Sequence, residues 1–289
     1  MSQYVTKIRT DAGDLQIDYN ALANLPELNT MFSNPNLLIN SDFRNPINQR
    51  GQTSYTGGGI YSIDRWMLGN SATLTVQDGS IKFEQSSGAT NTGRLVYRFE
   101  NALPANYYTI SVKVLSCNGG ASMDDFGTIA DGFTGVFTAT TTSEKELSSL
   151  RFYIAAGRSL EIEWIKLEQG TVATPFVPRL YDEELMLCKR YYQNINLYFR
   201  PGVVDYDGTT IVFVADTDFR STPSITMSIT PPSLRTAAVN SVSTTITYNN
   251  VYYSDGLCML FFTSSEDLGA RNVVWSCNAF KVIADAEIY

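Results

Sequence analysis

Acidic side chains are the first groups in this sequence that could do chemistry. Glu161 and Glu163 alternate along a predicted strand, about 7 Å apart by the rise of an extended chain, and glycoside hydrolysis needs only two carboxylates. Their neighbours Ile162 and Trp164 are expected to point to the other side of the strand. The pattern therefore favours a solvated strand face over a catalytic pair.

Several residue types and motifs that catalysis usually needs are missing. The chain of 289 residues contains no histidine, which excludes a Ser-His-Asp or Cys-His triad and a histidine-ligated zinc or iron site. It has no G-x-S-x-G, Walker or C-x-x-C motif, and the run Gly57-Gly58-Gly59 precedes a strand, so it is not a phosphate-binding loop. The sequence predicts no catalytic residues, no metal site and no cofactor.

Aromatic residues give a stronger signal. The chain has 17 Tyr, 15 Phe and 3 Trp, and Tyr and Trp combine a flat apolar face with a polar edge. Sugars present the complementary surface, so a saccharide site needs aromatic platforms beside amide, carboxylate, guanidinium and hydroxyl groups. Two stretches near predicted turns have this mixture. They supply the candidate carbohydrate-binding residues Tyr55, Tyr61, Asp64, Arg65, Tyr252, Tyr253 and Asp255.

The alternative is that these aromatic residues only pack. Strands use aromatic side chains to build cores, and for the tyrosines near turns the sequence favours neither role. Trp66, Trp164 and Trp275 each stand beside aliphatic residues, so we expect all three in the core.

Composition and charge exclude several classes of protein. Ser, Thr and Asn contribute 26, 29 and 20 residues, whereas only 17% of the chain is charged, a balance that suits β structure and extracellular exposure. The net charge of −8 argues against a protein that binds nucleic acid through its phosphates. No apolar stretch approaches the roughly 20 residues of a membrane-spanning helix, and the N-terminus has no apolar signal region. The four cysteines are widely spaced, and Cys188 and Cys258 lie in apolar runs, which indicates buried free thiols and folding in a reducing cytoplasm.

We expect a mainly β protein, beginning with a small N-terminal part. Residues 1–34 combine a predicted hairpin, YVTKIRT and DLQIDY, with an interrupted apolar cluster that is too short to bury itself. This part is interpreted as an attachment or oligomerisation segment. The alternative is a terminal extension that lies on the chain's own second domain.

Residues 35–170 carry strand signals throughout. About nine alternating runs follow one another with Gly, Asn or Ser between them, which predicts a jelly-roll β-sandwich. NLLINSDF, at 36–43, is the first of these predicted strands, and TLTVQDGSIKFEQ is the clearest hairpin because Asp78-Gly79 is a typical type I′ turn.

Residues 171–195 are predicted to be a linker followed by one helix, YDEELMLCKRYYQNI. Acidic residues lie at the start of this predicted helix and basic residues lie toward its end, as the helix dipole favours. Because the helix is apolar around much of its circumference, we expect it to be covered on most sides. Residues 196–289 return to strands and predict a C-terminal β-sandwich.

Three stretches resemble one family of proteins. NLLINSDFRNPINQRG followed by IYSIDRWML resembles the opening of phage and prophage tail-fibre proteins and, more distantly, the start of jelly-roll carbohydrate-binding modules attached to glycanases. KLEQGTVATPFVPRLYDEELMLCKRYYQ resembles the junction where the jelly roll of these tail proteins passes into a helix and a C-terminal β domain. YVTKIRTDAGDLQIDYNALANLP is similar to the N-terminal segment of phage tail-tip and fibre proteins. The matches span residues 4–193 in the expected order.

The resemblance implies a component of a virion tail, or of a phage-derived particle, that is made in the bacterial cytoplasm. It implies a homotrimer that binds a bacterial surface polysaccharide and contacts other tail or baseplate proteins through residues 1–34. Either β domain could carry the binding face, and we favour the C-terminal one, residues 196–289, because it is at the far end of the chain from the attachment segment. The glycanase-linked modules often hold calcium through a Glu soon after the Asp-Phe pair, whereas here Arg44 follows Phe43. The sequence thus predicts a non-enzymatic tail-fibre protein. The alternatives are a structural baseplate or fibre-connector subunit and a glycan depolymerase.

Overall fold

The chain forms strands over most of its described length. The computed structural model describes residues 7–10, 13–16, 33–196, 201–204, 209–216, 219–227, 233–236, 241–243, 246–254, 257–265, 268, 274–277 and 281–287. At the N-terminus, β1 (Lys7–Thr10) pairs antiparallel with β2 (Gly13–Gln16). The predicted hairpin is confirmed for these residues. The apolar cluster that follows it in the sequence lies outside the described residues.

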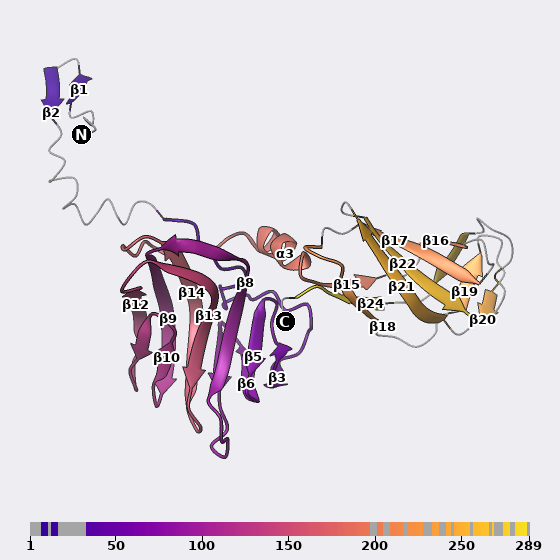
Figure 1. Ribbon diagram of the computed structural model, residues 1–289, viewed down its shortest axis with the longest axis horizontal. Helices are drawn as coiled ribbons and strands as arrows, with labels where there is room; N and C mark the ends of the chain where they lie inside the picture. The colour runs from indigo at the N-terminus through magenta and orange to yellow at the C-terminus, as the bar shows by residue number, and fades with distance from the viewer. Residues whose placement is uncertain are drawn as a thin grey trace.

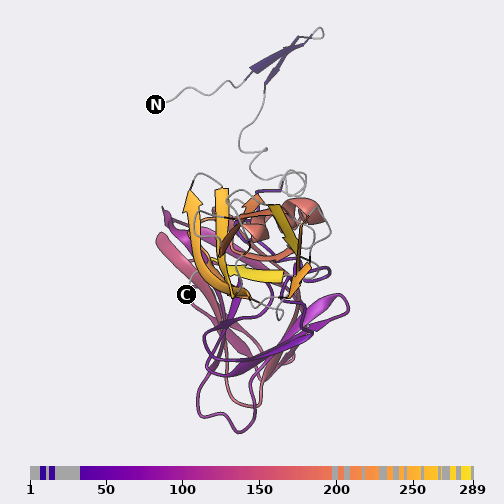
Figure 2. The same ribbon diagram turned by 90° about the vertical axis from the view of Figure 1, so that its right-hand side faces the viewer.

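A β-sandwich of two six-stranded antiparallel sheets follows (Figure 1). Consecutive strands often alternate between the sheets, which stack face to face (Figure 2). One sheet has the order β11 (Gly127–Ile129), β10 (Ala121–Met123), β13 (Lys145–Ile154), β8 (Gly93–Asn106), β5 (Trp66–Gly69), β4 (Ile60–Tyr61). The other has the order β12 (Gly135–Thr140), β9 (Tyr108–Asn118), β14 (Ser159–Gln169), β7 (Ser80–Glu84), β6 (Ala72–Gln77), β3 (Ser54–Gly57).

The sandwich core is built by alternate residues of these strands. Leu74 on β6 and Phe83 on β7 stand opposite each other and are fully buried, as the alternation around Asp78-Gly79 predicts. Trp66 is also fully buried and makes edge contacts with Phe43 and Tyr97 at 5.5 and 5.3 Å between ring centroids. The expected core position of Trp66 is confirmed.

The segment 36–43 is not the strand that its apolar pattern predicts. Asn36 replaces strand pairing with its side chain: its Oδ1 accepts from the backbone N–H of Leu38 and Leu167, and its amide donates to the carbonyl of Ile165. The backbone adds an isolated bridge between Asp42 and Trp164 and three single hydrogen bonds to β14, which join Leu37 to Leu167, Ser41 to Ile165 and Phe43 to Glu163. The asparagine thus holds an irregular segment against β14 through side-chain hydrogen bonds.

Trp164 is not in the core either, although its neighbours are aliphatic. The pairing of β14 with β9 shifts between Ile162 and Trp164, which leaves Glu163 as an extra residue. A one-residue shift turns every later side chain to the opposite face. Trp164 therefore faces outward, half-buried, and stacks on Phe176 of the linker with centroids 4.6 Å apart and planes 1° from parallel.

The same bulge turns Lys166 and Glu168 outward, where the linker covers them almost completely. Their side chains form an ion pair at 3.4 Å and are each 1% exposed. Lys166 donates to the carbonyls of Thr174 and Pro175, and Glu168 accepts from the backbone N–H and hydroxyl of Thr174. Burial lowers the pKa of Lys166 even though Glu168 opposes that effect. This clamp fixes the linker on the sandwich.

The described residues contain one helix, α3 (Tyr181–Lys189). It is shorter than predicted, because its expected last turn instead forms β15 (Tyr192–Asn196), which pairs with β24 (Lys281–Asp285). The expectation that the helix is covered on most sides is wrong. Within α3 only Cys188 is buried, whereas the side chains of Tyr181 and Met186 are 48% and 70% exposed.

Beyond α3 the chain forms a second lobe, beside the sandwich in Figure 1. Its three-stranded sheet has the order β15, β24, β18 (Ser224–Met227). Its seven-stranded sheet has the order β20 (Ser241–Ser243), β19 (Ser233–Thr236), β23 (Val274–Cys277), β16 (Pro201–Val204), β17 (Thr210–Asp216), β22 (Leu257–Ser264), β21 (Ile246–Ser254). One buried cluster joins the two sheets, with Phe213 and Phe262 on the larger and Val282 and Ala284 on the smaller.

The sequence also predicts buried free thiols and no membrane-spanning helix. Cys117, Cys188 and Cys258 are buried free thiols, as predicted for the latter two. In the part of the chain that the structure describes, no helix has the length and apolar character to cross a membrane. The side chain of Trp275 lies outside the described residues.

The clamp at β14 predicts a difference between single and double variants. Glu168→Ala leaves the Lys166 ammonium buried without its counter-charge, and we expect it to lower the free energy of unfolding by about 3–5 kcal/mol. The double variant Lys166→Met/Glu168→Leu removes both charges and should lose much less. Urea unfolding of the three proteins measures this, and equal losses in the single and double variants would contradict the clamp.

Candidate functional site

Four of the residues expected to bind carbohydrate lie inside the protein. A tight turn before β5 carries Asp64 and Arg65. In it the N–H and hydroxyl of Ser62 both donate to the carbonyl of Trp66, and Arg65 adopts a φ of 73°, which is rare for a residue with a Cβ. Both charged side chains are fully buried. The turn therefore points them into the junction between the two lobes.

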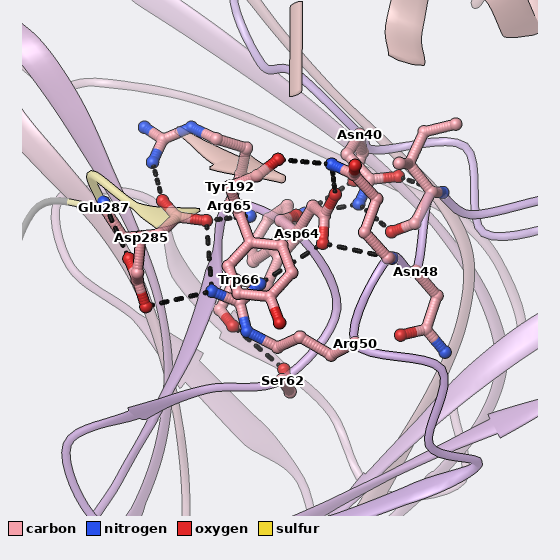
Figure 3. A network of polar contacts seen from close by, with 12 residues as sticks. Asn40, Asn48, Arg50, Ser62, Asp64, Arg65, Trp66, Tyr192, Asp285 and Glu287 are labelled. Atoms are coloured by element: carbon pink, nitrogen blue, oxygen red, sulfur yellow. Dashed lines mark hydrogen bonds and ion pairs between the residues drawn. The ribbon is translucent and has the colours of Figure 1, made fainter. Parts of the chain in front are cut away.

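Arg65 joins the sandwich to the end of the chain (Figure 3). Its guanidinium donates to Glu287 Oε2 at 2.6 Å and to the carbonyl of Arg98 at 2.5 Å, and its backbone N–H donates to Glu287 Oε1. The guanidinium carbon also lies 3.7 Å from the ring centroid of Tyr191, a close cation–π contact. Burial alone would lower the pKa of Arg65, but Tyr97 and Glu287 raise it, so the group stays charged.

Arg50 makes a second, parallel connection. Its guanidinium carbon lies 3.8 Å from the ring centroid of Tyr192, and one of its nitrogens is 3.2 Å from Asp64 Oδ1. The other terminal nitrogen lies 3.7 Å from both Asp285 and Glu287. Two arginines and three carboxylates thus alternate through the junction, and Figure 3 shows them together.

Asp64 is the most perturbed carboxyl group of this network. Burial raises its pKa from 3.8 to about 7, although Arg50 and Gln49 favour its charged form. Such a pKa would suit general acid–base chemistry. However, Asp64 has no exposed surface, so a substrate in solution cannot reach its carboxyl group. Its role is to hold the junction together.

Tyr55 and Tyr61 are likewise buried, at 4% and 5% exposure. The Tyr55 hydroxyl donates to Asn48 Oδ1 and accepts from the N–H of Gln52, while the Tyr61 ring lies 5.4 Å from the Arg50 guanidinium. A sugar cannot stack on a ring that has no free face. The prediction that Tyr55, Tyr61, Asp64 and Arg65 form a carbohydrate site is therefore wrong, and all four serve packing or the junction.

The second group of candidates includes one exposed platform. Tyr252 on β21 is 53% exposed, and it stands directly opposite Met259 on β22. Together with Asn249, Asn250 and Phe261, these residues line an open hollow with a volume of about 330 Å³. We call this the Tyr252 hollow.

A bulge shapes the rim of the Tyr252 hollow. The pairing of β21 with β22 shifts between Tyr248 and Asn250, so Asn249 is an extra residue, and both asparagines are exposed. Asn250 is exposed, and its Oδ1 accepts from the N–H of Val251 at 2.9 Å, so the oxygen is engaged and the amide NH2 is the group left to donate to a ligand. An apolar floor and amide donors on the rim are the groups that a saccharide needs.

Tyr253 points to the opposite face of β21. Its hydroxyl donates to the carbonyl of Phe219, and its ring makes an edge contact with the Phe219 ring at 6.0 Å. Tyr253 is therefore part of the lobe's packing and not a second platform. Asp255, the remaining candidate, lies outside the described residues.

Sequence reasoning missed four of the five residues of the hollow. Met259 and Phe261 alternate with the buried Cys258, Leu260 and Phe262 along β22. The sequence is a continuous apolar run at these positions, so only the fold shows which residues face outward. Asn249 and Asn250 were missed because the sequence does not reveal the bulge.

Glu161 and Glu163 lie on β14, where the sequence favours a solvated strand face over a catalytic pair. The carboxylate of Glu161 accepts from the hydroxyls of Ser80 at 2.8 Å and Ser116 at 3.2 Å. Within the described ranges, no group of three or more Cys, Asp or Glu side chains is placed to hold a metal ion.

Comparison with known proteins adds no relative: no protein-family model and no curated protein sequence matches this chain.

The raised pKa of Asp64 predicts a pH dependence of stability. Because the folded protein holds this proton more tightly than the unfolded chain, Asp64 contributes stability that is complete below about pH 4 and lost as the pH rises through about 7. Asp64→Asn removes this contribution. The free energy of unfolding of the unsubstituted protein minus that of the variant should therefore fall between pH 4.5 and 8.5. Denaturant unfolding at several pH values tests this, and a constant difference would contradict it.

Proposed function

We propose that this protein is a non-enzymatic attachment protein that binds a bacterial surface polysaccharide, as the receptor-binding part of a phage tail or phage-derived particle. The observation that carries the proposal is the Tyr252 hollow, where a half-exposed aromatic platform stands beside two exposed amides. The first lobe, with two antiparallel sheets and strands that alternate between them, is the jelly-roll scaffold of the proposal. The resemblance of the sequence to tail-fibre proteins supports the same function.

The lining residues of the Tyr252 hollow support binding of a sugar and not its cleavage. Its lining residues carry no charge, so it offers a sugar stacking and amide hydrogen bonds but no acid or base. A single shallow site of this kind binds weakly, because each sugar hydroxyl replaces a hydrogen bond to water by a hydrogen bond to the protein. In our proposal the chain is a homotrimer attached through residues 1–34, and many copies per particle supply avidity.

One observation favours the alternative of a structural connector subunit. Val203 on β16 and Val214 on β17 are 41% and 48% exposed on the outer face of the seven-stranded sheet. Val214 stands opposite Met259, so this apolar surface continues into the Tyr252 hollow. In a connector this face would be covered by another protein, and the Tyr252 hollow would not meet a sugar.

Substitution of the platform separates the two functions. We expect Tyr252→Ala to weaken binding of the protein to host-cell polysaccharide about fivefold per site, since an aromatic contact contributes about 1 kcal/mol. Tyr107→Ala is the matched control, because Tyr107 is 37% exposed on the sandwich and away from the hollow. A glycan array and competition with particle adsorption measure the effect.

Equal binding by Tyr252→Ala and the control would contradict the proposed site. Failure of the unsubstituted protein to bind any surface polysaccharide, together with failure of the variant to assemble, would support the connector. Release of shortened polysaccharide chains would show a depolymerase.

A further inference from the structure

A second cavity lies on the sandwich side of the molecule, away from the Tyr252 hollow. The irregular segment 36–45 forms one wall and the linker with the start of α3, 176–184, forms the other. Between them is a groove with a volume of about 180 Å³. We call this the linker groove.

The walls of the linker groove are fixed by contacts within the protein. Arg179 donates to the carbonyls of Leu38, at 2.8 Å, and of Asn36, and it pairs with Glu184 at 3.1 Å. Phe176 is held by its stack on Trp164. A groove with these walls exists before any ligand arrives, so binding does not have to order it.

Asp42, Arg179 and Glu184 are the charged residues that line the linker groove, and each carboxylate is paired with an arginine, Asp42 with Arg44 from outside the lining. Asp42 Oδ1 accepts from the backbone N–H and the Nε of Arg44, at 3.3 and 2.7 Å, and Asp42 Oδ2 accepts from Arg44 Nη2 at 2.8 Å. Glu184 pairs with Arg179, and its Oε1 also accepts from the backbone N–H of Asn40. The side chains of Asp42 and Glu184 remain 27% and 14% exposed. Each carboxylate oxygen has two acceptor sites, so Asp42 Oδ2 and Glu184 Oε2, which each accept one hydrogen bond, can still accept from a hydroxyl group. A balanced pair of this kind favours a neutral ligand rich in O–H donors over an anion or a cation.

The linker groove also offers a free amide and aromatic surface. Asn45 is exposed, and its side chain makes no hydrogen bond to the described residues. Tyr181 is 48% exposed at the start of α3, and Phe176 completes the lining. Acceptors, an amide and aromatic edges around one small space are the groups that recognise a pyranose ring.

We propose that the linker groove is a second saccharide site, which binds one neutral pyranose residue. Its volume is below the roughly 300 Å³ at which pockets for larger ligands begin, which limits it to about one ring. A further hollow of about 390 Å³ shares Asn36, Val177, Pro178 and Arg179 with it and is also lined by Ser33 and Leu180. This site does not depend on the Tyr252 hollow, because the two share no residue.

The experiment uses the full chain with Tyr252→Ala, so that the hollow at β21 does not contribute. Methyl glycosides of glucose, galactose, mannose and N-acetylglucosamine are titrated by saturation-transfer difference NMR, with methyl glycosides of glucosamine and glucuronic acid as charged probes. Asn45→Ala and Tyr181→Ala test the groove. Asn101→Ala and Tyr107→Ala are matched controls, because both residues are exposed on the sandwich and line none of the described cavities.

We expect at least one neutral glycoside to bind the Tyr252→Ala chain. Its dissociation constant should rise at least fivefold with Asn45→Ala and with Tyr181→Ala and stay unchanged in both controls. Loss of all binding in the Tyr252→Ala chain would overturn the linker groove and support the Tyr252 hollow. Equal binding by the groove variants and the controls, or tighter binding of a charged glycoside than of every neutral one, would also overturn it. Circular dichroism of each variant establishes that it is folded.

Discussion

The contact between Arg65 and Glu287 determines how the two lobes of this protein are joined. Neither charge has exposed surface, and their side chains meet at 2.6 Å across a sequence separation of 222 residues. Breaking one member of such a pair leaves a buried charge without compensation, which is strongly unfavourable. Arg50 reinforces the contact by stacking on Tyr192. Two contacts therefore attach the second lobe to the sandwich. Tyr192 of β15 lies at the start of the lobe, and Glu287 follows its last described strand.

This double attachment has a consequence for the proposed function. A chain that adheres to a surface must hold its weak sites in a fixed orientation if several copies are to bind together. A lobe tethered by a single flexible linker would lose that advantage through its own freedom of motion. The junction instead combines buried ion pairs, cation–π contacts and the clamp at Lys166 and Glu168, so the Tyr252 hollow and the linker groove lie on one connected framework.

The sequence predicts the local parts of this structure better than the contacts between them. The two-residue period around Asp78-Gly79 is enough to predict the hairpin of β6 and β7. The pattern at Trp164 is misleading, because a bulge reverses the side that it faces and no local signal marks the bulge. Asp64 and Arg65 have the composition of an exposed sugar site, and only a partner near the end of the chain shows that they are buried.

For the candidate binding surface, too, the sequence predicts the local pattern but not the contacts between distant parts of the chain. Tyr252 and Tyr253 are adjacent and of the same type, so the sequence ranks them equally. Their roles separate once the fold shows that Tyr253 bonds to Phe219 in the interior and Tyr252 stands in the open hollow. Alternation along a strand gives two faces, but tertiary packing decides which face meets solvent.

The central claim is our proposal that this framework binds neutral saccharides without cleaving them. Hydrogen–deuterium exchange of the full chain, with and without purified polysaccharide from a host surface, tests it most directly when the length of the polysaccharide is measured in the same samples. The account predicts slower exchange along β21 and β22 and in the segments 36–45 and 176–184, with the polysaccharide unchanged in length. Unchanged exchange in all of these segments, or shortened polysaccharide, would contradict it.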